Sequence, residues 1–233
     1  MNGLPRNVLD DPTLRNRTGV FADRCEAGIM LARFLRKTVA REPLLLAIPS
    51  GGVPVAVAMK RELGGALGLM PVRKLAIPFE PEAGFGALSL DGETVLNEDL
   101  VGAIGLTNEQ IDRSISLALS MLRRRMRLFG SGGELPDIRG KSVILVDDGL
   151  ASGYTMLAAV RSARKRLAAE VGVAVPTGSL AAVAMVAPEA SWVCCLNVRG
   201  GPSFAVADAY REWYDVPDAE AALFLRQATR RGP

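Results

Sequence analysis

Apolar residues recur along this chain with two different periods, which predicts that helices and strands alternate. Short, nearly continuous apolar runs are typical of strands buried in a parallel sheet, and they occur at residues 44–48, 72–77, 143–146, 171–175 and 191–196. Residues 94–97 are predicted to be a returning strand after the segment at residues 78–92. Stripes with helical spacing predict helices over residues 21–39, 53–67, 107–129, 155–169 and 179–186, with a closing helix from Pro217 onward. We therefore expect an α/β fold with a doubly wound, mostly parallel sheet that is covered on both faces.

Candidate chemistry concentrates where the predicted strand at residues 143–146 ends. Two carboxylates, Asp147 and Asp148, follow the strand directly, and a turn of small residues then opens a helix near Thr155. Ligands of open α/β sheets bind beyond the carboxyl ends of the strands, and a helix amino terminus offers free N–H groups to an anion. This junction therefore predicts an anion site. The simpler alternative is a solvated acidic pair followed by an ordinary capped helix.

Two further segments have the composition of ligand-facing loops. A Pro-Ser-Gly-Gly turn at residues 49–52 follows the strand at residues 44–48, although its glycines would equally serve backbone geometry alone. Residues 78–92 are rich in proline and glycine and lack a regular apolar period, which is typical of a mobile lid. Arg73 and Lys74 lie at the root of this segment, where they either face a ligand or are surface charges on an edge strand.

Length and composition narrow what such a site can do. The chain has 233 residues, which is enough for one α/β domain. It contains no histidine, which excludes Ser-His-Asp catalysis, Cys-His catalysis and His-ligated zinc. Cys25, Cys194 and Cys195 lack metal-ligand spacing, so we expect small buried apolar groups. The net charge of +3 mildly favours a small anionic ligand and does not argue for nucleic acid.

The apolar pattern does not indicate a membrane partner. No apolar run reaches the ~20 residues that span a bilayer. Residues 1–16 are polar and contain Pro5 and Pro12, which is atypical of a signal peptide or an amphipathic anchor. We therefore expect a cytoplasmic protein.

The segment from Lys141 to Met156 resembles the ribose-phosphate signature of type I phosphoribosyltransferases, which consists of an apolar strand, an acidic pair, a short turn and Thr/Ser-Gly-x-Thr. The resemblance extends over residues 21–225, and it implies that family's sheet with a small hood. It also implies that Asp147 and Asp148 hold the ribose hydroxyls of phosphoribosyl pyrophosphate. The residues implied to bind the 5-phosphate are Gly149, Ala151, Ser152, Gly153, Tyr154 and Thr155.

The same resemblance implies how the diphosphate is held. The residues implied to form the pyrophosphate loop are Ser50, Gly51, Gly52 and Val53. Ser50 stands where we expect Arg or Lys in this family. Residues 78–92 would close over the reacting ribose as a flexible loop, and Glu80 or Glu82 on that loop would be available as a general acid or base.

The C-terminal part of the chain is the candidate for the hood that selects the base in this family. We divide the chain into an arm at residues 1–20 that joins the hood, a core at residues 21–198, and a hood with a closing helix at residues 199–233. The aromatic residues of the predicted hood are Phe204, Tyr210, Trp213 and Tyr214. Such rings stack on a planar base or, alternatively, form a packing cluster that seals the hood against the core.

The helix at residues 107–129, an insertion in the core, ends in four cations, namely Arg123, Arg124, Arg125 and Arg127. The helix dipole favours cations in the last turns, which explains these arginines without a nucleic-acid partner. Residues 130–133 are predicted to be a flexible connector. A long exposed helix and an aromatic hood are compatible with a homodimer.

These features predict a transferase that moves ribose 5-phosphate between phosphoribosyl pyrophosphate and a nucleobase or similar nitrogenous acceptor, in nucleotide salvage or related metabolism. Arg73 and Lys74 would help the diphosphate leave. Asp147 and Asp148 would stabilise positive charge near the ribose and are candidate ligands of Mg²⁺, which the resemblance implies as cofactor. The alternative, favoured by Ser50, is a regulatory module that binds phosphoribosyl pyrophosphate or a nucleotide without turnover.

Overall fold

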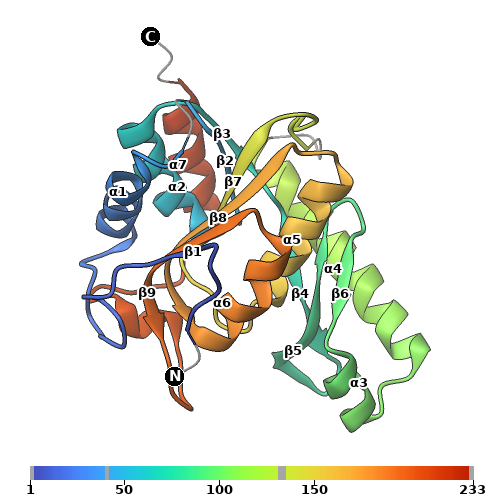
Figure 1. Cartoon of the computed structure of the whole chain (residues 1–233). Coiled ribbons are helices and arrows are strands. Elements are labelled where there is room, and N and C mark those ends of the chain that lie inside the picture. The colour runs from blue at the N-terminus through green and yellow to red at the C-terminus, as the bar shows by residue number, and fades with distance from the viewer. Residues whose placement is uncertain (1–2, 40–41, 131–134, 231–233) are drawn as a thin grey trace.

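A six-stranded sheet in which every pairing is parallel forms the centre of the protein (Figure 1). The computed structural model describes residues 3–39, 42–130 and 135–230, so the predicted connector beyond Gly130 lies outside the described residues. In spatial order the strands are β1 (Val8–Leu9), β9 (Trp192–Arg199), β8 (Glu170–Ser179), β7 (Ser142–Val146), β2 (Leu44–Ala47) and β3 (Ala66–Leu69). The predicted mostly parallel sheet is confirmed, although the apolar run at residues 72–77 belongs to a different, antiparallel sheet.

Helices cover both faces of this sheet, as predicted. They are α5 (Tyr154–Lys165) and α6 (Leu180–Val186) on one face, and α1 (Arg24–Leu35), α2 (Gly52–Leu63) and α7 (Asp218–Arg230) on the other. Short 3₁₀ helices, η1 (Ala187–Glu189) and η2 (Val206–Ala209), follow α6 and β9. In β7, Val143 and Leu145 pack in the core with α5, whereas Ile144 and Val146 pack in the core with α1 and α2. This alternation buries the central strand on both sides.

The cysteines divide between buried and exposed positions. Cys194 and Cys195 are adjacent in β9, point to opposite cores and are buried, as predicted; burial raises the pKa of both thiols. Cys25 is exposed, so the prediction is wrong for this residue. Helix α1 buries a face that does not include Cys25. Gly28 belongs to the buried face and lies against α2, where a Cβ would be 2.4 Å from the Val55 carbonyl oxygen.

A second sheet, three-stranded and antiparallel, stands beside the first. It consists of β4 (Val72–Ile77), β5 (Glu80–Ser89) and β6 (Thr94–Leu96), and it is covered by α3 (Glu98–Ile104) and α4 (Asn108–Leu128). Most of the segment predicted to be an irregular lid at residues 78–92 is therefore strand. Glycine misled the prediction: at Gly86 a Cβ would lie 2.2 Å from the Val95 carbonyl oxygen, so the glycine allows β6 to pair closely with β5.

Two more element boundaries differ from the prediction. The helix expected over residues 53–67 ends at Leu63, because Gly64 and Gly65 adopt φ values of 76° and 83°, and the apolar residues after them form the edge strand β3. Helix α3 was not predicted. The capping box of Thr107 and Gln110 at the start of α4 is confirmed.

Within the described part of the chain, no helix combines the length and apolar character that a bilayer-spanning segment requires.

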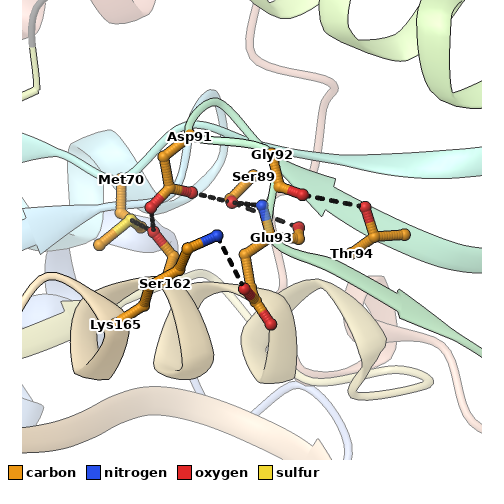
Figure 2. Close-up of polar contacts among 8 residues, drawn as sticks. All are labelled: Met70, Ser89, Asp91, Gly92, Glu93, Thr94, Ser162 and Lys165. Carbon is orange, nitrogen blue, oxygen red and sulfur yellow. Dashed lines mark hydrogen bonds and ion pairs between the residues drawn. The ribbon is translucent and has the colours of Figure 1, made fainter.

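The turn between β5 and β6 is fastened to α5, as Figure 2 shows. The hydroxyl of the fully buried Ser162 donates to Asp91 Oδ2 at 3.0 Å, and the Ser89 hydroxyl donates to the other oxygen of the same carboxylate. Lys165 Nζ lies 3.3 Å from Glu93 Oε2. These contacts hold the antiparallel sheet on α5.

We expect Ser162→Ala to lower the free energy of unfolding by about 1–2 kcal/mol, because the Asp91 carboxylate loses a buried hydrogen-bond donor. Chemical denaturation measures the change. The matched control is Thr94→Val, whose hydroxyl donates to the Gly92 carbonyl in the exposed part of the same turn; it should cost less than about 0.5 kcal/mol. Equal effects of the two substitutions would contradict the anchoring role of Ser162.

Candidate functional site

A cavity of about 420 Å³ lies at the carboxyl ends of β2 and β7, between the parallel sheet and the antiparallel one. It brings together six of the residues that the sequence predicts for the site, namely Gly51, Arg73, Lys74, Asp147, Asp148 and Thr155. Helix α4 closes the cavity with Ser114, Leu117, Ala118, Met121 and Arg125. Acidic and basic side chains from distant parts of the chain therefore face one small volume.

The acidic pair at the end of β7 is held by an arginine from the first helix. Arg24 Nε donates to Asp148 Oδ2 at 2.9 Å, and the Arg24 side chain is only 7% exposed. Its guanidinium lies 3.8 Å from the centroid of the Trp213 ring and donates to the Tyr214 carbonyl at 2.9 Å. Asp147 Oδ1 accepts the Asp148 backbone N–H at 2.9 Å. Sequence reasoning missed Arg24, because a cation 124 positions away carries no local signal.

Burial makes both carboxylates weaker acids than usual. Burial raises the pKa of Asp147 well above its ordinary value, and the neighbouring charge of Asp148 raises it further. Burial also raises the pKa of Asp148, with the Arg24 guanidinium acting in the opposite direction. A bound cation or a set of hydroxyl donors would favour the ionised pair, so the pair is suited to a ligand that supplies them.

The loop between β2 and α2 is pressed against this pair. A Cβ on Gly51 would lie 2.0 Å from Asp148 Oδ2, and one on Gly52 would lie 2.5 Å from the Val146 carbonyl oxygen. The Pro49–Ser50 peptide in this loop is cis. Only glycine permits such an approach, so the loop lies directly against the acidic pair at Gly51.

Ser50 and Val53, two other residues of that predicted loop, do not line the cavity. Val53 lies in the first turn of α2 and is buried in the core with residues of α1. Its N–H donates to the Ser50 carbonyl at 3.1 Å. The Ser50 hydroxyl donates to Asp218 Oδ1 at 2.5 Å, at the first residue of α7.

The turn that leads into α5 has the geometry of an anion site. Gly153 is the residue before the helix and adopts φ 87°, and no side chain of the described residues caps the first turn. The first N–H groups of a helix have no partner within the helix, so they are available to a phosphate. Hydrogen bonds from Leu150 N to the Thr177 carbonyl, and from Ser179 Oγ to the Ala151 carbonyl, fix the turn to β8.

Three more predicted residues lie apart from this site. The Tyr154 side chain faces a separate hollow beside Ile111 and Arg161, so only its backbone is positioned for an anion. Glu80 and Glu82 are exposed and are not among the described residues that line the cavity.

Three of the aromatic residues of the predicted hood, Tyr210, Trp213 and Tyr214, lie around Arg24. The centroid of the Tyr210 ring lies 5.7 Å from that of Phe21 and 5.1 Å from that of Trp213, and the Tyr210 hydroxyl donates to the Asp148 carbonyl at 2.7 Å. Neither Tyr210 nor Trp213 is among the described residues that line the cavity. Phe204 packs under Arg199, and Tyr214 is half exposed with its hydroxyl on Glu220. In the structure, Tyr210 and Trp213 thus pack with Phe21 and Arg24.

Comparison with known proteins identifies the family. The family model of the phosphoribosyl transferase domain matches residues 102–198 of this chain. Proteins of two Mycobacterium tuberculosis strains, provisionally named phosphoribosyl transferases, are 38% identical over 211 residues, which cover 91% of this chain and 47% of theirs. The chain spans about half the length of these curated relatives. It belongs to the phosphoribosyltransferase family, as the signature at the end of β7 indicates.

Solved structures agree with the fold. The protein TT1426 from Thermus thermophilus is 32% identical to this chain, with a TM-score of 0.73. The match includes 89% of this chain and 98% of TT1426. A Neisseria gonorrhoeae protein solved with bound ppGpp is 19% identical to this chain, with a TM-score of 0.51. That match includes 93% of this chain and 98% of the Neisseria protein. At that identity the second likeness shows the fold alone.

We expect Gly51→Ala to lower the free energy of unfolding by about 1–3 kcal/mol, because the added methyl group displaces either the loop or the Asp148 carboxylate. Chemical denaturation measures the loss. The matched control is Gly102→Ala in α3, where a Cβ meets open space; it should be neutral or stabilising by up to about 1 kcal/mol. A harmless Gly51→Ala would contradict the close approach of the loop.

We expect Asp147→Asn to raise the free energy of unfolding at pH 7 by about 1 kcal/mol, and the melting temperature by roughly 2–4 °C, because it removes a buried charge. A carboxyl group with a raised folded pKa costs stability while it is ionised. This cost is relieved as the pH falls toward the ordinary value of 3.8. The advantage of the variant over the wild type should therefore shrink on acidification.

The control for this substitution is Asp112→Asn on the exposed face of α4, which should change the free energy of unfolding by less than about 0.5 kcal/mol at any pH. A lower melting temperature for Asp147→Asn would mean that the ionised carboxylate stabilises the fold, contrary to this account.

Proposed function

We propose that this chain transfers ribose 5-phosphate between phosphoribosyl pyrophosphate and a nucleobase or similar nitrogenous acceptor. The observation that carries this proposal is one cavity that is lined by the Asp147–Asp148 pair, by Thr155 at the start of α5, and by cations. Its volume of about 420 Å³ lies within the range of small-molecule sites. The family to which the chain belongs supports the reaction class.

Each part of the cavity suits one part of that substrate. The acidic pair would accept the ribose hydroxyls, and the first turn of α5 would bind the 5-phosphate through its N–H groups. Arg73 and Lys74, on β4 across the cavity, would attract the diphosphate. The raised pKa of Asp147 and Asp148 fits this use, because hydroxyl donors and nearby cations restore the ionised form that burial disfavours.

The reaction breaks the bond between ribose C1 and a diphosphate oxygen, whose electron pair leaves with the diphosphate. A nitrogen of the acceptor forms the new bond to C1 and loses its proton. Positive charge develops at the ribose in between, where Asp147 and Asp148 would stabilise it. Arg73 and Lys74 would stabilise the negative charge of the departing group, and α4 would exclude water from the cavity.

The carboxylates also fit Mg²⁺. Hard oxygen donors suit this ion, which usually takes one or two protein carboxylates and completes its shell with phosphate oxygens and water. The described residues contain no cluster of three or more acidic, Cys or His side chains, so an ion held mainly by the substrate suits the pair. When bound, Mg²⁺ would neutralise part of the diphosphate charge.

A second candidate is a regulatory module that binds phosphoribosyl pyrophosphate without turnover. The observation in its favour is Ser50, which replaces the basic residue expected in the loop and whose hydroxyl is engaged by Asp218. The two candidates share the binding site and differ only in whether an acceptor reacts.

Steady-state turnover of a panel of purine and pyrimidine bases with phosphoribosyl pyrophosphate and Mg²⁺ tests the proposal. We expect product with at least one base, and Asp148→Asn should lower kcat/KM by about 100-fold or more, because a charge that acts in the transition state is lost. Asp112→Asn should leave turnover unchanged. Inactivity on every base with retained calorimetric binding of phosphoribosyl pyrophosphate would favour the regulatory module, and absent binding would contradict both candidates.

A further inference from the structure

The basic end of α4 is divided between solvent and the cavity. Arg123, Arg124 and Arg127 are exposed, whereas the Arg125 side chain is 22% exposed and lines the cavity. The buried face of α4 next to it, which includes Leu122 and Met126, packs the helix down and turns Arg125 inward. The helix dipole explains cations at this end in general, but it does not explain why one of them points into the ligand cavity.

Arg125 contacts the loop that lacks its own cation. Its Nη1 donates to the Pro49 carbonyl at 3.3 Å, and its Nε donates to Asp218 Oδ2 at 3.0 Å. The other oxygen of Asp218 accepts the Ser50 hydroxyl. One carboxylate therefore engages both the guanidinium and the loop hydroxyl, which are donors of the kind that a phosphate oxygen accepts.

The charge at this end of the cavity favours a multiply charged anion. Arg73 on β4 is close enough that burial and the charge of Arg125 lower its pKa, while Asp218 acts in the opposite direction. Lys74 lines the same cavity. Arg73, Lys74 and Arg125 therefore line one cavity, and a guanidinium presents its N–H groups in a planar fork that matches phosphate oxygens.

We propose that Arg125 binds the diphosphate group of the sugar substrate, in place of the basic residue that the Pro49–Gly52 loop lacks, and that the diphosphate competes with Asp218 for the Arg125 guanidinium. This inference rests on the proposed function for the identity of the ligand. It moves the cation of the pyrophosphate site from the loop to helix α4. A purely structural role, in which the ion pair only fastens α7 to α4, is the competing account.

Calorimetric titration of the full chain with Mg²⁺ and three probes tests the inference, the probes being phosphoribosyl pyrophosphate, inorganic pyrophosphate and ribose 5-phosphate. Arg125→Gln should weaken binding of the two diphosphate-containing probes by about 10- to 100-fold, the usual effect of losing a hydrogen bond to a charged group. Ribose 5-phosphate should bind as before, since it lacks the diphosphate. Arg124→Gln, one position away and exposed, should leave all three affinities unchanged.

Asp218→Asn separates the two accounts, because it breaks the same ion pair and leaves Arg125 in place. If Arg125 binds the diphosphate, removing the competing carboxylate should keep or tighten pyrophosphate binding. If the ion pair is only a fastener, Asp218→Asn should weaken binding as Arg125→Gln does, and that result would overturn the inference. If Arg125→Gln does not fold, the Asp218→Asn result alone decides between the two accounts.

The wild-type titration distinguishes failure of this inference from failure of the proposed function. Wild-type binding of phosphoribosyl pyrophosphate with unchanged affinity in Arg125→Gln overturns the role of Arg125 and leaves the proposed function standing. Equal weakening of ribose 5-phosphate binding by Arg125→Gln also overturns that role. Absence of wild-type binding overturns the proposed function, and the inference with it.

Discussion

The ion pair between Arg24 and Asp148 is the interaction on which the site depends. Two adjacent, largely buried carboxylates repel each other and are poorly solvated, so they need a partner that the residues around them in the sequence do not provide. Arg24 supplies it from α1, and the Trp213 ring and the Tyr214 carbonyl hold Arg24 from the C-terminal part of the chain. The first helix, the central strand and the tail therefore meet at one carboxylate.

The wall of the cavity that faces the acidic pair is positively charged, and its residues come from the antiparallel sheet and α4. Arg73 and Lys74 line it from β4, and Arg125 lines it from α4. The turn after β5 is fastened to α5 through Asp91 and Ser162. Because α5 also begins at the candidate phosphate turn, one helix supports both that turn and the cationic wall, which keeps the two at a fixed separation.

Much of the fold could be predicted from local patterns, and the errors have local causes. The apolar runs of β2, β7, β8 and β9 identified buried strands, because strands buried on both faces are apolar throughout. The antiparallel strand β5 was missed because glycines such as Gly86, which its close pairing requires, conceal the apolar period. Edge strand β3 was missed because its first two residues, Ala66 and Leu67, read as a continuation of α2 beyond Gly64 and Gly65.

The sequence by itself determined the parallel α/β sheet, through the apolar pattern of each strand, and the acidic pair and small-residue turn at the end of β7, since each of these patterns is local. Only the tertiary structure decided which cations complete the site. Arg24 and Arg125 lie far along the chain from the groups they contact, and their roles arise because helix packing turns them inward. Long-range partners of a buried charge depend on how elements pack, and a single sequence carries no periodic signal for that.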